Sequence, residues 1–187
     1  SMKVLHINAV SGIRSTGRIC AEIIEALNEE GYKGYIAYAH GIKARGYKIG
    51  GKFDRKCHGL LSRITGKQGY FSILETYRLL RYIEFLNPDV IHLHNLHGNY
   101  INIKILFKYI AKKDIPTVIT LHDCWFFTGK CCHYTVDRCY KWKEECDKCP
   151  RIHKDNPSWF FDKSNKMYHD KKELLEQIKD LAVVGVS

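Results

Sequence analysis

Residues 90–123 read VIHLHNLHGNYINIKILFKYIAKKDIPTVITLHD and contain a strand, a helix and a second strand in that order. Residues 90–93 and 117–121 are short apolar runs without alternating polarity, which is typical of strands buried on both faces of a sheet. Apolar residues recur between them at helical spacing, namely Ile105, Leu106, Tyr109 and Ile110. A strand, helix and strand in this order predict two parallel strands of an α/β sheet.

The same alternation continues in both directions along the chain. Residues 4–8 and 35–39 read as strands, and the helix between them has an apolar face formed by Cys20, Ile23, Ile24 and Leu27. Ser72 is a plausible N-cap for a helix that ends at Asn87-Pro88. Residues 41–69 are rich in Gly, Lys and Arg, and we expect a loop there with at most one short helix. Near the end of the chain we expect a helix over Leu174, Leu175, Ile178 and Leu181, and then a strand over residues 182–186.

Length and composition favour one soluble globular domain. The chain has 187 residues, of which 45% are hydrophobic, and this is enough for one sizeable core. We therefore expect residues 1–187 to form a single Rossmann-like domain, with helices on both faces of a parallel sheet and an irregular excursion rich in Cys and aromatic residues. No apolar run approaches the roughly 20 residues that span a bilayer, and no signal peptide is recognisable, so we expect a cytoplasmic protein. The formal charge of +10 favours an anionic partner.

Polar residues follow three of the predicted strands. Asn8 precedes a loop over residues 11–17, His94-Asn95 follows the strand at 90–93, and His122-Asp123 follows the strand at 117–121. Parallel strands bring these ends to one edge of the sheet, where ligands bind in α/β proteins. The alternative is that a residue such as His122 merely caps its strand.

The loop from Gly12 to Gly17 has the glycine spacing of a nucleoside-triphosphatase P-loop. Arg18-Ile19 stand where that motif requires Lys and Ser or Thr, so the ATPase interpretation fails. The loop still opens a helix, whose free N–H groups favour an anion such as a diphosphate. An ordinary turn between a strand and a helix is the alternative.

Eight cysteines are present, and we expect them to be reduced because no export signal accompanies them. Cys131, Cys139, Cys146 and Cys149 are candidates for a structural zinc site, with Cys132 and His133 as substitute ligands. Free thiols packed beneath an aromatic-rich loop are the alternative. A catalytic zinc at the histidines of residues 92–97 and 122 is not expected, because no carboxylate pattern accompanies them.

The chain resembles the amino-terminal half of a bacterial glycosyltransferase of family 4 with the GT-B fold. Three stretches carry the resemblance: VLHINAVSGIRSTGRI at residues 4–19, PDVIHLHNLHGNYINIKIL at residues 88–106, and TLHDCWFFTGKCCHY at residues 120–134 with a later CDKCP. The last stretch resembles the branch that builds capsular, exopolysaccharide or lipopolysaccharide chains.

The resemblance implies transfer of a sugar from a nucleotide-diphosphate sugar to a glycan or lipid-diphosphate acceptor, with retention and no obligatory metal. It implies that His122 and Asp123 are catalytic, and that the donor phosphates lie at Gly12, Ser15, Thr16 and Gly17. The acceptor would lie toward His94, Asn95 and Asn99. The loop lacks the family's adjacent glycine pair, which leaves Gly12 and Gly17 as equal candidates.

The resemblance also implies a second domain that binds most of the donor and lies outside this sequence, so we expect this chain alone to be inactive. The basic residues would favour peripheral association with the inner face of the membrane. We expect no nucleic acid as partner. Two alternatives remain at this point: a zinc-bearing, basic nucleic-acid-binding module, and a non-catalytic sugar-binding domain of the same fold.

Overall fold

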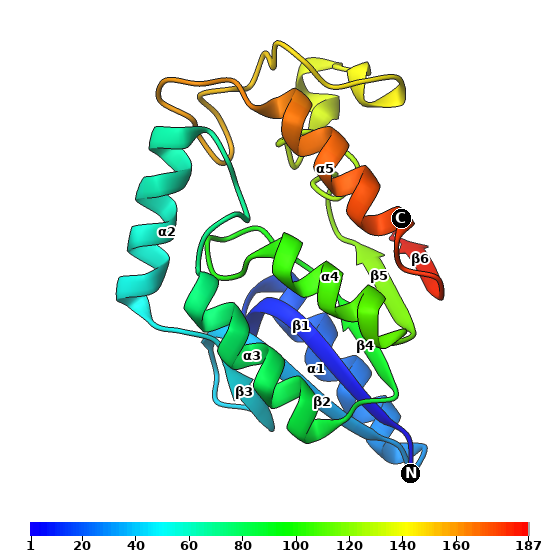
Figure 1. Ribbon diagram of the computed structural model, residues 1–187. Helices are drawn as coiled ribbons and strands as arrows, with labels where there is room; N and C mark the ends of the chain where they lie inside the picture. Colours follow the sequence, from blue (N-terminus) through cyan, green and yellow to red (C-terminus); the bar gives the residue numbers. More distant parts are fainter. Residues whose placement is uncertain (187) are drawn as a thin grey trace.

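A computed structural model describes residues 1–186 of the chain. Its centre is a six-stranded sheet with the order β3-β2-β1-β4-β5-β6 (Figure 1). Every pair of neighbouring strands is parallel. The strands are β1 (Lys3–Ser11), β2 (Lys33–Gly41), β3 (Gly46–Lys48), β4 (Val90–Leu93), β5 (Thr117–Leu121) and β6 (Leu181–Gly185). The predicted Rossmann-like α/β fold is confirmed.

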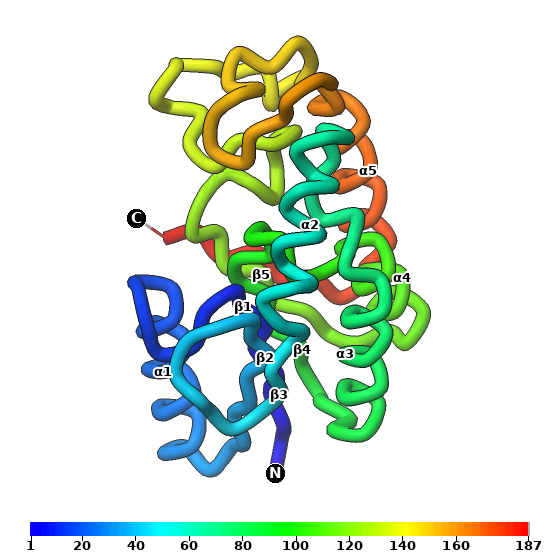
Figure 2. Tube along the Cα trace, turned by 90° about the vertical axis from the view of Figure 1, so that its left-hand side faces the viewer, coloured from blue at the N-terminus to red at the C-terminus, as the bar shows by residue number. Residues whose placement is uncertain are grey.

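Helices cover the two faces of the sheet unequally. Helix α1 (Arg14–Glu29) lies on one face, whereas α3 (Ile73–Leu86), α4 (Ile103–Lys113) and α5 (Ser164–Glu176) lie on the other (Figures 1 and 2). Helix α2 (Lys52–Thr65) stands beyond the carboxyl ends of the strands. Residues 122–163 rise at the same end, with only two 3-10 turns, η1 (Tyr134–Asp137) and η2 (Lys141–Lys143). The carboxyl edge of the sheet is therefore framed by α2 and this irregular segment. None of the described helices is both long and apolar enough to cross a bilayer.

Alternation along the central strands separates an apolar face from a polar one. Leu5, Ile7 and Leu93 are fully buried in the main core beneath α3 and α4. Because successive side chains of a strand point to opposite faces, the intervening residues lie on the α1 side. On β1 these are His6 and Asn8, both fully buried. The sheet thus keeps a row of polar side chains under α1 that leads to its carboxyl edge.

The segment over residues 41–69 corrects the sequence interpretation. It contains β3 and the fourteen-residue helix α2 instead of a loop with one short helix. Helix α2 buries polar or small residues, His58, Gly59 and Ser62, and exposes apolar ones such as Phe53 and Leu60. An inverted pattern of this kind does not resemble the usual amphipathic helix, in which the apolar residues face the core.

Of three other element ends, one agrees with the prediction in position and two differ from it. Ser72 precedes α3 but makes no capping bond with its side chain, because its Oγ is held by His58 and Asp54. Helix α1 begins at Arg14, so Ser15, Thr16 and Gly17 lie in its first turn. The last helix ends at Glu176, and Leu181 opens β6. The predicted bounds of α3 are therefore correct, whereas α1 begins earlier and the last helix ends earlier than the sequence predicts.

Gly41 closes the carboxyl end of β2 against β1. Its φ is +118°, and a Cβ there would lie 2.3 Å from the carbonyl oxygen of Ser11. This close approach is available only to glycine. It holds the two strand ends together beside the loop over residues 11–17.

Candidate active site

Three histidines form a hydrogen-bonded relay that ends at the carboxyl edge of the sheet. The Nε2 atom of His122 lies 2.9 Å from Nδ1 of His94, and Nε2 of His94 lies 3.0 Å from Nδ1 of His6. His6 and His94 are fully buried, whereas His122 is partly exposed. We call His6, His94 and His122 the imidazole relay. It connects the interior of the sheet with the solvent-facing end of β5.

A fourth imidazole stacks on the relay. The ring of His92 lies 4.1 Å from that of His94 and 4.9 Å from that of His6, measured between centroids. Its Nε2 lies 2.7 Å from the hydroxyl of Thr120. The parallel register places His6 beside His92, so strand pairing itself brings these rings together.

Burial keeps these imidazoles neutral at physiological pH. It lowers the pKa of His6 to about 3 and that of His92 to about 4, with neighbouring imidazoles contributing in the same direction. Burial likewise lowers the pKa of His94 far below its ordinary value. The pKa of His122 is lowered by burial, although the charge of Asp123 opposes the shift. Each neutral ring has one N–H donor and one acceptor nitrogen.

Asp123 organises the loop that follows β5. One carboxylate oxygen accepts the backbone N–H of Trp125 at 2.9 Å, and the other lies 2.6 Å from Nε2 of His97. Burial works against ionisation of Asp123, but the hydrogen bond and charge of His97 outweigh it and hold the pKa of the carboxyl below its usual value. Asp123 therefore ties the loop after β4 to the loop after β5, as a charged acceptor.

The predicted phosphate loop forms the turn into α1. Gly12 has a φ of +64° and donates its N–H to the carbonyl oxygen of Gly17 at 3.3 Å. Ser15 is exposed, whereas Gly17 is buried. No side chain caps the amino end of α1. Free N–H groups at a helix start attract anions, so this turn can receive a phosphate beside the relay.

The residues assigned to the acceptor occupy different surroundings. His94 is fully buried within the relay. The backbone of Asn95 is fixed, because its N–H donates to Oδ1 of Asn8 at 3.1 Å and its carbonyl accepts the hydroxyl of Tyr100 at 2.5 Å. Asn99 lines an open cavity. Of the three, only Asn99 lies where a large polar ligand has room.

That cavity is strongly basic, and we call it the basic cavity. It measures about 530 Å³ and lies between α2, the end of β2 and the loop after β4, lined by His40, Lys52, Arg55, Lys56, Gly59, Leu60, Arg63, Gly98, Asn99 and Trp159. Burial and the charges of Arg55, Arg14 and Lys48 lower the pKa of His40. Gly98 and Asn99 directly follow His97, the partner of Asp123. The same loop thus connects the basic cavity to the relay.

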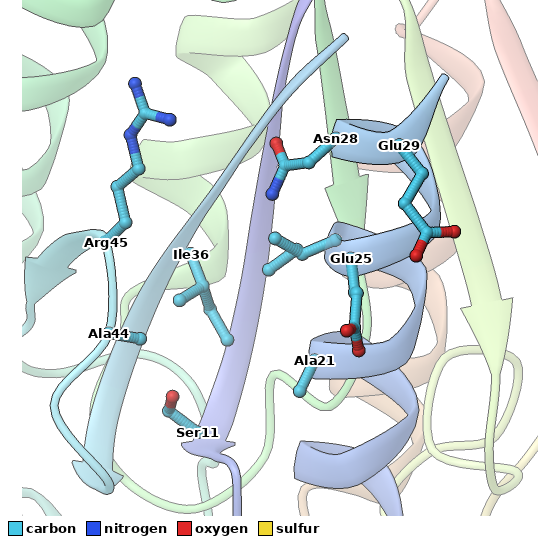
Figure 3. Close-up of a pocket in the computed structure, with 9 residues that line it drawn as sticks. Ser11, Ala21, Glu25, Asn28, Glu29, Ile36, Ala44 and Arg45 are labelled. Carbon is cyan, nitrogen blue, oxygen red and sulfur yellow. The ribbon is translucent and has the colours of Figure 1, made fainter. Parts of the chain in front are cut away.

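A second cavity of about 460 Å³ lies between α1 and β2 (Figure 3). Ala21, Glu25 and Asn28 of α1 face Ile36 of β2 across it, with Arg45 at its rim. None of the predicted site residues lines it. Its apolar floor and scattered charges carry no chemistry related to the relay.

All eight cysteines are free thiols. The pKa of Cys146 is raised to about 11 by burial and by the neighbouring thiols of Cys131 and Cys139. Burial and the nearby Cys131 also raise the pKa of Cys149.

Two groups of possible metal ligands have atoms within 4.8 Å of one another in residues 1–186. They are His6, Cys20 and His94, and His97, Asp123 and Cys132. The four predicted cysteines are not such a group. Cys132, the predicted substitute ligand, lies beside His97 and Asp123. The hydrogen bonds of the imidazole relay and of Asp123 already account for most of the nitrogen and oxygen atoms in both groups.

Sequence reasoning missed His6 and His97. The signal for His6 was its place two residues before Asn8, which puts both side chains on one face of β1. His97 lies in a loop, and no periodic signal relates it to Asp123. It was found only because the loops after β4 and β5 converge in the folded chain.

Comparison with known proteins identifies the family of the chain. The family model for Glycosyltransferase Family 4 matches residues 16–168. The chain is 29% identical, over 132 residues, to a colanic acid biosynthesis glycosyl transferase, WcaC, of Escherichia coli (strain K12). That match covers 68% of the chain and 31% of the relative, so the chain spans about a third of that protein's length. With a parallel sheet, a site at its carboxyl edge and a family match over most of its length, the chain belongs to glycosyltransferase family 4.

Proposed function

We propose that the complete protein transfers a sugar from a nucleotide-diphosphate sugar to a glycan or lipid-diphosphate acceptor in cell-surface polysaccharide synthesis, with retention of configuration. The bond from the anomeric carbon to the diphosphate breaks, and a bond from that carbon to the acceptor oxygen forms on the same face. The acceptor's proton leaves with the diphosphate. The observation that carries the proposal is the imidazole relay at the carboxyl edge of a family 4 domain.

The relay supports a specific role for His122. Three neutral imidazoles in a row must all donate in the same direction, so the free proton sits either on Nε2 of His6 or on Nδ1 of His122. Nε2 of His6 is buried without a partner among the described residues. Buried N–H groups without an acceptor are rare, because each loses its hydrogen bond to water. The favoured arrangement leaves His122 with an N–H directed at the reacting sugar.

In this proposal His94 and His6 are positioning residues, and Asp123 orients the loop. The donor diphosphate lies at the start of α1, near Gly12, Ser15, Thr16 and Gly17, where the uncapped N–H groups are available. Because the relay is neutral, the N–H of His122 can orient the donor sugar through a hydrogen bond to one of its oxygen atoms without placing a full positive charge beside the positive charge that develops on the sugar. Misplacement of a bound substrate typically costs a factor of about 10² in rate.

The basic cavity supports an anionic acceptor. Lys52, Arg55, Lys56 and Arg63 all line it, and no carboxylate is among its lining residues. Cationic side chains converging on one cavity are suited to a diphosphate. Asn99 is placed to bind a sugar hydroxyl beside that diphosphate.

The exposed face of α2 supports a location at a membrane. Apolar side chains project from α2 and from a segment tied to it by the bond from the N–H of Trp159 to the carbonyl of Arg63 at 2.8 Å. We call this set the apolar surface: Phe53, Leu60, Leu61, Ile64, Trp159, Phe160 and Phe161. Phe53 is 81% exposed and Phe160 is 69% exposed. Lys52 and Lys56 belong to the same helix, and a lysine near anionic lipid contributes about 1 kcal/mol.

This geometry brings a lipid-linked acceptor to the site from the bilayer. The apolar surface would rest among the lipid headgroups at the inner face of the membrane, and the basic cavity beside it would receive the diphosphate of the acceptor. Nucleotide sugars are supplied from the cytoplasmic side, which is the side of the relay. No nucleic acid takes part in the proposed reaction.

Activity of the complete protein tests the proposal. Purified protein would be incubated with UDP-, GDP- and dTDP-sugars and a membrane extract that contains lipid-linked acceptors. We expect one donor to be consumed, and we expect His122→Ala to lower kcat/KM about 100-fold or more while His169→Ala, an exposed residue of α5, does not. Circular dichroism of both variants checks the fold. Unchanged turnover in folded His122→Ala would refute the role of His122, and inversion in the product would refute retention.

Flotation with liposomes tests the membrane location separately. We expect the complete protein to float with vesicles that contain anionic lipid, and the double variant Phe53→Ser with Leu60→Ser to stay in the soluble fraction. Phe85→Ser is the matched control, because Phe85 is 86% exposed on α3, outside the apolar surface. Equal flotation of both variants would contradict the proposed surface.

A further inference from the structure

Trp125 anchors the turn that follows His122 and Asp123, and each of its three polar groups has a hydrogen-bond partner. Its backbone N–H donates to Oδ1 of Asp123 at 2.9 Å, and its indole N–H donates to Oε1 of Gln68 at 3.2 Å. Its carbonyl accepts a hydrogen bond from Nζ of Lys171 in α5. The residue is only 1% exposed. Trp125 therefore fixes the turn that carries the two residues on which the proposed reaction depends.

Lys171 is buried against Trp125. Its Nζ lies 4.1 Å from the centroid of the Trp125 ring, and the residue is 2% exposed. A cation over the face of a tryptophan is attracted by the electron density of the ring. The carbonyl and the ring of Trp125 thus both contact the Lys171 ammonium, which connects α5 to the turn after β5.

The charge of Lys171 has no counter-ion. Lys171 forms no salt bridge with a carboxylate within residues 1–186, and the Trp125 carbonyl is the single oxygen atom that accepts a hydrogen bond from it there. Burial lowers the pKa of Lys171 to about 7, because removal of the ammonium from water is unfavourable. A lone buried charge of this kind destabilises the folded chain.

Lys130 shows how a buried lysine is accommodated without such a cost. It is also 2% exposed, but its Nζ donates to three backbone carbonyls between residues 151 and 154, at 2.8 to 3.2 Å. An ammonium has three donors, so each donor of Lys130 has an acceptor. Lys171 has one oxygen acceptor for the same number of donors. Lys130 is therefore suited to stabilising the chain, whereas Lys171 is not.

Destabilising groups are retained in proteins mainly where function requires them. We propose that Lys171 is a positioning residue of the transfer reaction: its ammonium holds the carbonyl and the ring of Trp125 and thereby fixes the turn that presents His122 and Asp123. The proposal rests on the transferase function proposed above. Because it is buried, Lys171 contacts no substrate and acts through Trp125.

A movement of Trp125 would reach the site through hydrogen bonds of the turn. Without Lys171, the N–H of Trp125 can shift away from Oδ1 of Asp123, whose other oxygen lies 2.6 Å from Nε2 of His97. His122 directly precedes Asp123, so its ring moves with the same segment. A displacement of about 1 Å in an active site can lower the rate by about 100-fold. Loss of the Lys171 contact is therefore expected to slow the reaction from a distance.

Thermal unfolding of the complete protein separates positioning from stabilisation. Lys171→Met replaces the ammonium with an apolar side chain of similar length, so we expect a Tm at pH 7 at least as high as that of the parent. We expect Lys130→Met to lower the Tm, because three carbonyls lose their donor. A lower Tm for Lys171→Met, or failure of that variant to fold, would overturn the proposal, since Lys171 would then stabilise the chain as Lys130 does.

Steady-state kinetics with the UDP-, GDP- or dTDP-sugar that the parent uses measure the effect on the reaction. We expect Lys171→Met to lower kcat about 10- to 100-fold with little change in the KM for the donor, as loss of orientation at the reacting sugar does. Lys171→Gln can still donate to the Trp125 carbonyl without a charge, so its kcat should be intermediate. Lys172→Met is the matched control, because Lys172 is the exposed next residue of α5, and it should keep the parent kcat. Equal kcat in Lys171→Met and the parent would overturn the proposal.

Hydrogen exchange followed by mass spectrometry tests the positioning without a substrate. We expect the amides of residues 122–128 to exchange at least about 10-fold faster in Lys171→Met, and those of β1 and β4 to exchange at the parent rate. Unchanged exchange in residues 122–128 would overturn the proposal, whichever donor the parent uses. A parent that transfers no sugar from any donor would count against the transferase proposal, whereas the exchange rates still decide whether Lys171 holds the turn.

Discussion

Mild acid should destabilise this fold through the imidazoles packed under α1. His6 has a pKa of about 3 and His92 of about 4 in the folded chain, against an ordinary value of 6.5. The pKa values of these two histidines are lower in the folded chain than in the unfolded chain. As the pH falls, the unfolded chain therefore binds more protons than the folded chain. Stability is therefore complete above pH 6.5 and is lost as the pH falls toward the folded values.

The magnitude follows from the two shifts. Each of these two histidines lowers the free energy of unfolding by about 1.4 kcal/mol for every pH unit below 6.5, which amounts to about 2 kcal/mol at pH 5. His6 and His92 together therefore account for about 4 kcal/mol between pH 7 and pH 5. His94 acts in the same direction. The free energy of unfolding of a domain is typically only about 5–15 kcal/mol, so the loss between pH 7 and pH 5 is a large share of it.

Urea unfolding at pH 7 and at pH 5, followed by circular dichroism, measures this loss. We expect His92→Gln, which retains a hydrogen-bond donor but does not titrate, to reduce the loss by about 2 kcal/mol. His169→Gln is the control, because that side chain is 52% exposed. Equal unfolding free energies at the two pH values would refute the assignment of buried neutral imidazoles, and so would an unchanged loss in His92→Gln.

Three further predictions concern local geometry. NMR of protein with isotope-labelled histidine should show that the Nδ1 atom of His122 is protonated and that its Nε2 atom is not. A proton on Nε2 of His122 would contradict this, because the hydrogen bonds of the relay would then run in the opposite direction and the free N–H would lie on buried His6. Gly41→Ala should lower the unfolding free energy by about 1–3 kcal/mol, because its Cβ would meet a carbonyl oxygen at 2.3 Å; a stability equal to that of the parent would contradict this contact. Asn102→Ala should lower the free energy of unfolding, measured by thermal unfolding, by about 1–2 kcal/mol. The Asn102 side chain caps α4 and also donates to the carbonyl of Tyr70 at 2.7 Å. A change in unfolding free energy smaller than the experimental error would argue against the cap.

Much of the fold was predictable because the central strands can be recognised as short apolar runs in the sequence. Residues 90–93 and 117–121 are mostly apolar, although His92 and Thr120 lie on the polar face, and the polar residues that follow these strands do converge at one edge. Helix α2 was not predicted at its full length, because its buried residues are His58, Gly59 and Ser62 whereas its Phe53 is exposed to solvent. Sequence periodicity locates a helix by assuming that its apolar face is inside, and α2 violates that assumption.

The site was predictable in part for a related reason. His122 and Asp123 follow a recognisable strand, so their place at the edge could be expected. His6 was hidden inside a strand that reads as apolar, and its importance comes from its register beside His92 on a neighbouring strand. The basic cavity depends on α2, so it could not be located before that helix was known.

The imidazole relay also limits how the sequence can change. Replacing one relay member with an apolar residue leaves a neighbouring ring nitrogen buried without a partner, which costs about 1–3 kcal/mol. Losing two adjacent members together avoids part of that cost, since both ends of a hydrogen bond disappear at once. Positions 6, 94 and 122 should therefore vary together among relatives, as histidines in all three or in none, even though they lie on three different segments of the chain.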